Sequence, residues 1–247
     1  MATARNGQFL LRIEDIDQSR ARPEWEAAIY TDLHWLGLNW PAPVLRQSER
    51  GATYAEALNQ LWTRGLLYPC TCTRRDIEAA ASAPQEGVPL HGPDGVIYPG
   101  TCRPKEPITT LPIPKDTALR LDIAHALATL PPEPLRFTEN GAGPDGASGD
   151  VVLLRRDMGT SYHLSVVLDD AAQGITDVVR GQDLFEATQI HVLLQQLLGF
   201  PTPTYHHHRL IRDDTGKRLA KRDDARAIAK YRAEGATPTD IRAMIGL

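Results

Sequence analysis

The sequence predicts an α/β fold, in which a layered core is interrupted by an inserted subdomain and followed by a short helical C-terminal part. Three observations predict it: strand-like segments alternate with amphipathic helices, a Pro- and Gly-rich stretch holding every cysteine divides them, and the C-terminal residues are basic. The expected segments are 1–69 for the first part of the core, 70–148 for the insertion, 149–204 for the second part, and 205–247 for the C-terminal part.

The composition is that of an ordinary globular protein. The chain has 247 residues, which is enough for a sizeable core, with 42% hydrophobic and 23% charged residues. No apolar run approaches the roughly 18 residues of a membrane span, and no secretory signal opens the chain. Three cysteines argue against a disulfide framework. We therefore expect a cytoplasmic protein that does not contact membranes.

Charge is distributed unevenly along the chain. The net charge is −4, yet residues 205–247 hold ten Lys and Arg against six Asp and Glu. A basic segment on an acidic body is typical of local contact with a phosphate-bearing partner. A solvated helical face explains the charge equally well.

The first part of the core begins with "FLLRIEDID", whose residues 9–13 predict a strand buried on both faces and followed by an acidic turn. Residues 22–37 and 52–65 predict helices that each end at a glycine. The first helix has Pro23 near its start. Its expected core-facing stripe consists of Trp25, Ile29, Leu33 and Leu36.

Short strands are expected in the insertion and longer ones after it. Within the insertion, "ALRLDI" (118–123) and "LRFTE" (135–139) are strand-like. The second part of the core has strand-like "GDVVLLRRD" (149–157), "YHLSVVLDD" (162–170) and "GITDVVRG" (174–181). "DLFEATQIHVLLQQLLG" (183–199) predicts a helix that stops at Gly199.

All the cysteines, Cys70, Cys72 and Cys102, fall within the Gly- and Pro-rich stretch. Thiolates at this spacing can converge on a tetrahedral zinc ion, which would hold together a segment rich in loops. Tyr98 and His91 are the candidates for a fourth ligand, and general zinc chemistry prefers His91 because histidine is a much commoner ligand. The alternative is three free, partly buried thiols.

The C-terminal part carries a cluster of cations and a run of histidines. "DDTGKRLAKRDDA" (213–225) sets Lys217, Arg218, Lys221 and Arg222 around a Gly-containing turn, where they could neutralise a polyphosphate or simply face solvent. "HHH" (206–208) alternates faces in an extended chain, so these side chains do not chelate one ion together. We expect a polar strand end near the active site.

Three polar residues are candidates for binding an amino acid. Glu14 closes the first expected strand, Arg180 ends another, and Tyr162 begins a third. The carboxyl ends of strands are where α/β sheets place ligand-binding groups. Glu14 could pair with an ammonium group and Arg180 could grip a carboxylate with two hydrogen bonds. The alternative is that both are ordinary ions at strand ends.

Together these stretches resemble the glutamyl-tRNA synthetase group of class I aminoacyl-tRNA synthetases, and most closely its short paralogues, the glutamyl-Q tRNA(Asp) synthetases. The resemblance rests on "FLLRIEDIDQSR", "LYPCTCTR…IYPGTCR", "GDVVLLRRD", "SYHLSVVLDDAAQGITDVVRGQDLF" and "GKRLAKRD". These stretches span nearly the whole chain in the order of the family. The resemblance implies a Rossmann-like catalytic core whose insertion is an acceptor-type subdomain that binds zinc.

The resemblance also implies residue roles. One structural zinc ion would be bound by Cys70, Cys72, Tyr98 and Cys102, in place of the His91 that chemistry alone prefers. Glu14, Tyr162 and Arg180 would hold glutamate. Lys221 matches the second lysine of the "KMSKS" loop, which stabilises the triphosphate of ATP, with Mg²⁺, during attack. Here the loop reads "RLAKR", so Arg218 replaces the first lysine and Ala220 replaces the serine.

The implied reaction is ATP-dependent activation of L-glutamate, followed by its transfer to the queuosine base at the wobble position of tRNA(Asp). In this family another strand, a "HIGH"-like loop and a helix precede the "RIEDID" strand. We therefore expect roughly 20 to 35 further residues upstream of Met1, judged from ordinary element sizes, and without them an unpaired edge on the 9–13 strand. Two alternatives are a non-catalytic remnant that binds zinc and tRNA, and a truncated glutamyl-tRNA synthetase. The complete protein is expected to be a monomer.

Overall fold

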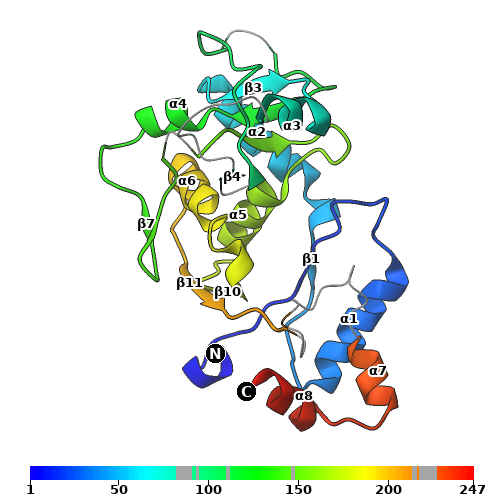
Figure 1. The fold of residues 1–247 in the computed structure, drawn as a ribbon. Helices are drawn as coiled ribbons and strands as arrows, with labels where there is room; N and C mark the ends of the chain where they lie inside the picture. Colours follow the sequence, from blue (N-terminus) through cyan, green and yellow to red (C-terminus); the bar gives the residue numbers. More distant parts are fainter. Residues whose placement is uncertain (82–90, 93–94, 110–111, 146–147, 213–215, 217–226) are drawn as a thin grey trace. The chain divides into compact units, whose positions relative to one another are not determined.

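The structure is a computed structural model that describes residues 1–81, 91–92, 95–109, 112–145, 148–212, 216 and 227–247 (Figure 1). The chain divides into two compact units. The first unit comprises residues 1–49 and 209–247, and the second comprises residues 50–208. The four segments expected from the sequence stay a prediction.

A small parallel pair of strands organises the first unit. Strand β1 (Arg12–Ile13) pairs with β2 (Leu45–Arg46), and helix α1 (Pro23–Trp35) forms the crossover between them. The expected strand over 9–13 is wrong in its first half, because Phe9 is 38% exposed and only Ile13 is buried. A continuous apolar run indicates that a segment tends to be buried, but it does not determine how long the strand is. The partner strand β2 has only two residues, so only Arg12 and Ile13 pair with it.

Helix α1 starts at its proline as expected, but its apolar stripe is not buried. Trp25 and Ile29 are 48% and 43% exposed, and no residue of the helix is buried. The expectation of a core-facing stripe is therefore wrong, since periodicity predicts the helix without saying what covers it. The short helices α7 (Ile228–Ala233) and α8 (Pro238–Ile245) instead contact α1 through polar groups.

An antiparallel sheet lies at the centre of the second unit. Its strands run in the order β3 (Leu67–Cys70), β6 (Ala118–Leu121) and β9 (Val151–Leu154). Strand β6 belongs to the expected insertion, while β9 belongs to the segment that follows it. The sheet thus pairs strands from three of the segments expected separately. Helix α2 (Gly51–Thr63) packs beside it, with Leu58 and Leu61 fully buried.

A βαβ unit completes the second unit. Strand β10 (Asp177–Gly181) pairs in parallel with β11 (Thr204–His208), and α6 (Thr188–Leu198) connects them. The predictions of this strand and helix are confirmed, and the helix ends at Gly199 in the left-handed conformation. The "HHH" run lies in β11, so the expected strand is confirmed as well.

The segment "YHLSVVLDD" is helical, which corrects the expected strand. Helix α5 spans Tyr162–Ala172, and the Ser161 hydroxyl caps its first turn by accepting a hydrogen bond from the Leu164 N–H. Residues 163–169 are all buried, between α2 on one side and α6 on the other. A helix buried all round has no polar stripe, so its pattern cannot be told from that of a buried strand.

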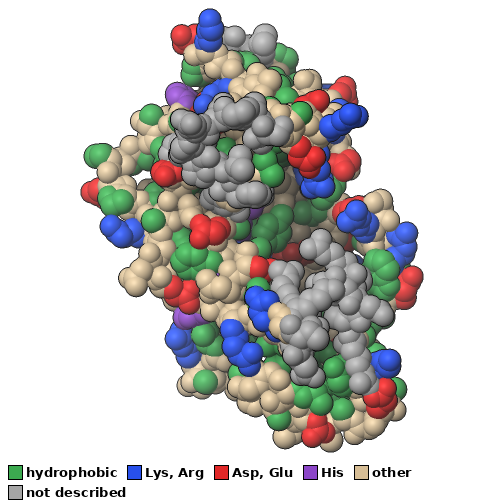
Figure 2. Space-filling view, viewed as in Figure 1, with side chains coloured by type: hydrophobic (Ala, Val, Ile, Leu, Met, Phe, Trp, Pro, Cys, Tyr) green, Lys and Arg blue, Asp and Glu red, His purple; other side chains and the backbone are tan. Residues whose placement is uncertain are grey.

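Charges are mixed over the surface, as the face in Figure 2 shows, where acidic and basic side chains are interspersed. Within the described residues, none of the helices has the length and apolar character needed to span a bilayer.

Candidate functional site

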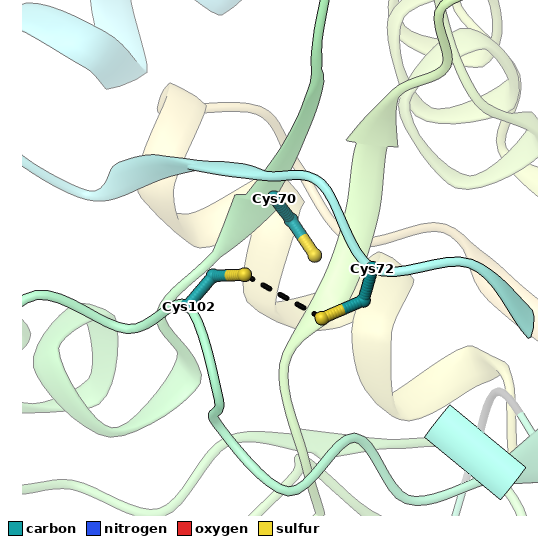
Figure 3. Close-up of side chains that lie close together, drawn as sticks. All are labelled: Cys70, Cys72 and Cys102. Carbon is teal, nitrogen blue, oxygen red and sulfur yellow. Dashed lines mark hydrogen bonds between the residues drawn. The ribbon is translucent and has the colours of Figure 1, made fainter. Parts of the chain in front are cut away.

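The three cysteines come together in the second unit. Cys70 ends strand β3, Cys72 follows two residues later, and Cys102 comes from the loop after Gly100. Their Sγ atoms lie within 4.8 Å of one another, and those of Cys72 and Cys102 are 3.5 Å apart (Figure 3). The side chains point toward a common centre.

Tyr98 adds a fourth donor atom to this cluster. Its hydroxyl oxygen lies 3.5 Å from Sγ of Cys70 and 3.6 Å from Sγ of Cys72, and it accepts a hydrogen bond from the backbone N–H of Cys102. The structure thus brings together the four residues implied by the resemblance. The side chain of His91 lies outside the described residues.

The distances fit a tetrahedral metal ion. With Zn–S bonds of about 2.3 Å and Zn–O bonds of about 2.0 Å, tetrahedral geometry requires sulfur–sulfur separations of about 3.8 Å and sulfur–oxygen separations of about 3.5 Å. The pKa of Cys102 is lowered to about 6, chiefly by a hydrogen bond from the Tyr98 hydroxyl. Cys102 is therefore readily available as the thiolate that a metal requires.

Two buried residues, Arg120 and Asp150, support the cysteine cluster, and neither of them was singled out from the sequence. Arg120 on β6 donates from Nε to Sγ of Cys70 at 3.3 Å, and its Cζ lies 3.8 Å from the centre of the Tyr98 ring. A second N–H group of Arg120 donates to the Asp150 carbonyl oxygen. One feature of the sequence could have indicated this role of Arg120: it is the only basic residue among the apolar residues of "ALRLDI".

Asp150 is 4% exposed and accepts several hydrogen bonds. The donors are the Tyr68 hydroxyl, Nε of Arg103 and the backbone N–H of Ile123. A buried carboxylate with this many donors forms a rigid support beside strand β3, which carries Cys70.

A second polar cluster surrounds Arg180, the fourth residue of β10. Its Nε donates to Nε2 of His207 on β11 at 3.3 Å, and NH1 donates to Nδ1 of His191 on α6 at 3.0 Å. NH2 forms a very short hydrogen bond with Oγ1 of Thr188. The guanidinium also lies over the Tyr205 ring, with Cζ 4.9 Å from its centre.

The arginine determines which nitrogen of each histidine carries a proton. A guanidinium only donates, so Nδ1 of His191 and Nε2 of His207 must be unprotonated acceptors. His191 therefore bears its proton on Nε2, which faces Nδ1 of His163 at 3.1 Å. Burial lowers the pKa of His191 well below 6.5, and the charges of His163 and Arg180 act in the same direction. His191 is thus held neutral.

Tyr162 lies beside the same cluster, although not at a strand end. It is the first residue of α5, and its ring centre lies 5.7 Å from that of His191 and 5.8 Å from that of His163. The side chain is partly open to solvent, since the residue is 37% exposed. Tyr162 and Arg180 therefore contact the same histidine.

The structure does not test the roles expected for the remaining site residues. Glu14 follows β1 in the first unit and forms an ion pair with Arg12 at 3.2 Å. Its convergence with Tyr162 and Arg180 stays a prediction. Arg218 and Lys221 lie outside the described residues.

The fold and a family comparison define the class of protein. The model of the tRNA synthetases class I (E and Q), catalytic domain, matches residues 1–91 and 138–247. The chain also superimposes on the crystal structure of a glutamate tRNA ligase from Elizabethkingia meningosepticum in complex with its amino acid, with a TM-score of 0.65 and 24% identity. That match covers 94% of this chain and 52% of the ligase, so the chain spans about half the length of the solved structure.

Curated relatives narrow this class. The glutamyl-Q tRNA(Asp) synthetase of Rhodobacter capsulatus is 62% identical over 261 aligned residues, which cover 100% of this chain and 91% of the relative. That of Symbiobacterium thermophilum is 42% identical, covering 95% of this chain and 74% of the relative. The chain therefore belongs to the glutamyl-Q tRNA(Asp) synthetase family of class I synthetases. This relationship does not favour either alternative, the non-catalytic remnant or the truncated glutamyl-tRNA synthetase.

Proposed function

We propose that the protein activates L-glutamate with ATP and transfers the glutamyl group to the queuosine base of tRNA(Asp). The observation that carries this proposal is the 62% identity, over the whole chain, to a glutamyl-Q tRNA(Asp) synthetase. In the first step a glutamate carboxylate attacks the α-phosphorus of ATP and pyrophosphate leaves. In the second step a nucleophile on the queuosine base attacks the acyl carbon and AMP leaves.

Arg180 and Tyr162 are the proposed glutamate-binding residues of the second unit. Within the described part of the chain, the contacts of Arg180 use three of its five N–H groups. One N–H group remains on each terminal nitrogen, and this pair matches the two oxygens of a carboxylate. The partly exposed Tyr162 hydroxyl supplies a further polar contact, and Glu14 is assigned to the ammonium group.

The cation cluster of the C-terminal part is assigned to ATP. Lys221 is assigned to stabilising the negative charge that develops on the triphosphate, and Arg218 supplies a second positive charge. Mg²⁺ is expected to bind together with the nucleotide. Both assignments rest on the sequence alone.

One zinc ion is assigned to Cys70, Cys72, Tyr98 and Cys102. Bound zinc would cross-link strand β3 to the loop that carries Cys102. The ion has no part in the chemistry of glutamate activation, and its role is to hold the insertion in shape.

Glutamate-dependent exchange of labelled pyrophosphate into ATP, measured without tRNA, tests the first step. We expect exchange with L-glutamate and none with L-aspartate or L-glutamine. A chain that supports no exchange would be the non-catalytic remnant.

Transfer to tRNA tests the second step. We expect labelled glutamate to appear in a base-labile linkage on tRNA(Asp) that contains queuosine, and on none that lacks it. Labelling of tRNA(Glu) at its terminal adenosine would identify a truncated glutamyl-tRNA synthetase instead.

A further inference from the structure

A short hairpin of the expected insertion covers the free edge of the strand beside Arg180. Strands β7 (Arg136–Phe137) and β8 (Gly141–Ala142) form this hairpin, and Thr138 and Glu139 lie in its turn. Oγ1 of Thr138 accepts from the Tyr205 N–H at 2.8 Å and donates to the Tyr205 carbonyl oxygen at 2.6 Å. In the described part of the chain β11 pairs only with β10, and the Thr138 hydroxyl supplies the hydrogen-bond partners that a second neighbouring strand would otherwise provide.

Glu139 contacts His207, which lies two residues after Tyr205 on β11. Oε1 of Glu139 accepts from the backbone N–H of His207 at 3.0 Å, and Oε2 accepts from Nδ1 of His207 at 2.6 Å. The His207 side chain is fully buried, whereas that of Glu139 is 37% exposed. The carboxylate therefore reaches inward from the surface to a buried imidazole.

A carboxylate gives each of these two groups an acceptor oxygen of its own. Nε2 of His207 accepts from Arg180, so Nδ1 carries the proton, and the second group is a backbone N–H. In glutamine an NH2 group, which only donates, would replace one of the two oxygens and would face a donor. The hydrogen bond from His207 also lowers the pKa of Glu139, which keeps it ionised.

The backbone of the hairpin is held in an unusual conformation. Glu139 and Asn140 have φ of 63° and 59°, a left-handed region that non-glycine residues seldom occupy. Phe137 anchors the hairpin, with its ring centre 5.2 Å from that of Phe185 and 5.9 Å from that of Tyr205. Such conformations persist where the surroundings hold them, and they cluster at functional sites.

We propose that Glu139 is a positioning residue for Arg180. Through His207 it determines the imidazole tautomer and thereby the direction of the Nε donor of Arg180, which orients the fork of the guanidinium toward glutamate. The inference rests on the proposed function of Arg180. It assigns the hairpin of the insertion a part in amino-acid binding, although the hairpin itself touches no glutamate.

Substitution Glu139→Gln tests the proposal in the full chain. In this variant the amide NH2 faces either the His207 backbone N–H or its Nδ1–H, so one of these donors loses its acceptor. Alternatively, the His207 proton moves to Nε2, where it faces the Nε–H of Arg180 and the hydrogen bond between them is lost. We expect the KM for glutamate in pyrophosphate exchange to rise about tenfold, in line with one lost charge-assisted hydrogen bond. The KM for ATP should stay within about twofold of the wild-type value, because the ATP assignment involves other residues.

Further variants distinguish a specific effect on the orientation of Arg180 from a general loss of structure. Glu133→Gln, on an exposed residue of the same insertion, should leave both KM values unchanged. Glu139→Asp keeps two acceptor oxygens and should recover part of the loss. Gly141→Ala leaves the carboxylate intact but moves the hairpin, because the added Cβ would lie 2.0 Å from Cζ of Phe137. It should also raise the KM for glutamate.

Nitrogen-15 NMR of the imidazoles gives a readout that does not depend on activity. We expect wild-type His207 to carry its proton on Nδ1, and the Glu139→Gln variant to show a changed tautomer or a lost Nδ1–H signal. Wild-type exchange combined with an unchanged KM for glutamate in Glu139→Gln would overturn the role of Glu139 alone. A wild-type protein without glutamate-dependent exchange would overturn the proposed function and this role together.

Discussion

Arg120 donates a hydrogen bond from Nε to the sulfur of Cys70 over 3.3 Å, from a side chain that is only 7% exposed. Three thiolates and a phenolate around one divalent ion would carry a net negative charge, which is costly to bury unless a cation lies nearby. Arg120 supplies that cation and also holds the Tyr98 ring in place.

Arg120→Gln should therefore weaken zinc binding by about 10- to 100-fold, the usual effect of losing a residue that supports metal ligands. Competition with a chromophoric chelator measures the affinity. Arg75→Gln, on an exposed residue of α3 (Arg74–Ala81), serves as the control and should bind zinc like the wild type. Equal affinities for Arg120→Gln and the control would contradict this view of the cluster.

Arg180→Lys should raise the KM for glutamate by about 100-fold although the charge is retained. A single ammonium group cannot donate to His191 and His207 and also present two parallel N–H groups to a carboxylate. Pyrophosphate exchange at varied glutamate concentration measures the effect, with Arg75→Lys as the control. If lysine substitutes at less than threefold cost, Arg180 does not bind a carboxylate through two hydrogen bonds.

The buried His191 should make stability depend on pH. Its pKa in the folded protein is well below 6.5, the unfolded value, so the unfolded chain binds more protons as the pH falls below 6.5. The free energy of unfolding should then decrease by up to about 1.4 kcal/mol per pH unit below pH 6.5 through this residue.

Urea unfolding between pH 5 and 7.5 measures this dependence. In His191→Gln the slope should be smaller than in the wild type by about one proton. Parallel curves for wild type and His191→Gln would show that His191 takes up a proton in the folded state as well.

Asp169→Asn should destabilise the second unit by about 3 kcal/mol. The Asp169 carboxylate is fully buried and accepts from Nε of Arg50 at 2.6 Å and from the Tyr54 hydroxyl at 2.8 Å, so it joins α5 to the start of α2. An amide leaves the arginine without its counter-charge. Chemical denaturation of Asp169→Asn and of the neighbouring Asp170→Asn measures the difference, and similar losses in the two variants would contradict the assignment.

Local patterns predicted elements wherever one face of an element differs from the other or a glycine ends it. Helices α2 and α6 and strand β10 were found this way. Helix α5 was mistaken for a strand because it is buried on all sides, and β1 was expected to be too long because hydrophobicity does not reveal the length of its partner. The apolar stripe of α1 is exposed for a similar reason: periodicity predicts a helix but does not show which segment covers it.

Among the candidate sites, the sequence by itself determined the identity of the chemical groups: three cysteines close enough along the chain to share an ion, and an arginine near the end of a strand. Only the tertiary structure brought Tyr98 to the sulfurs, set Arg120 behind them and placed Glu139 against His207, 68 residues away. The physical reason is that spacing along a strand or turn determines which residues are neighbours locally. Contacts between distant segments depend on how the buried surfaces pack, and a single sequence does not display that packing.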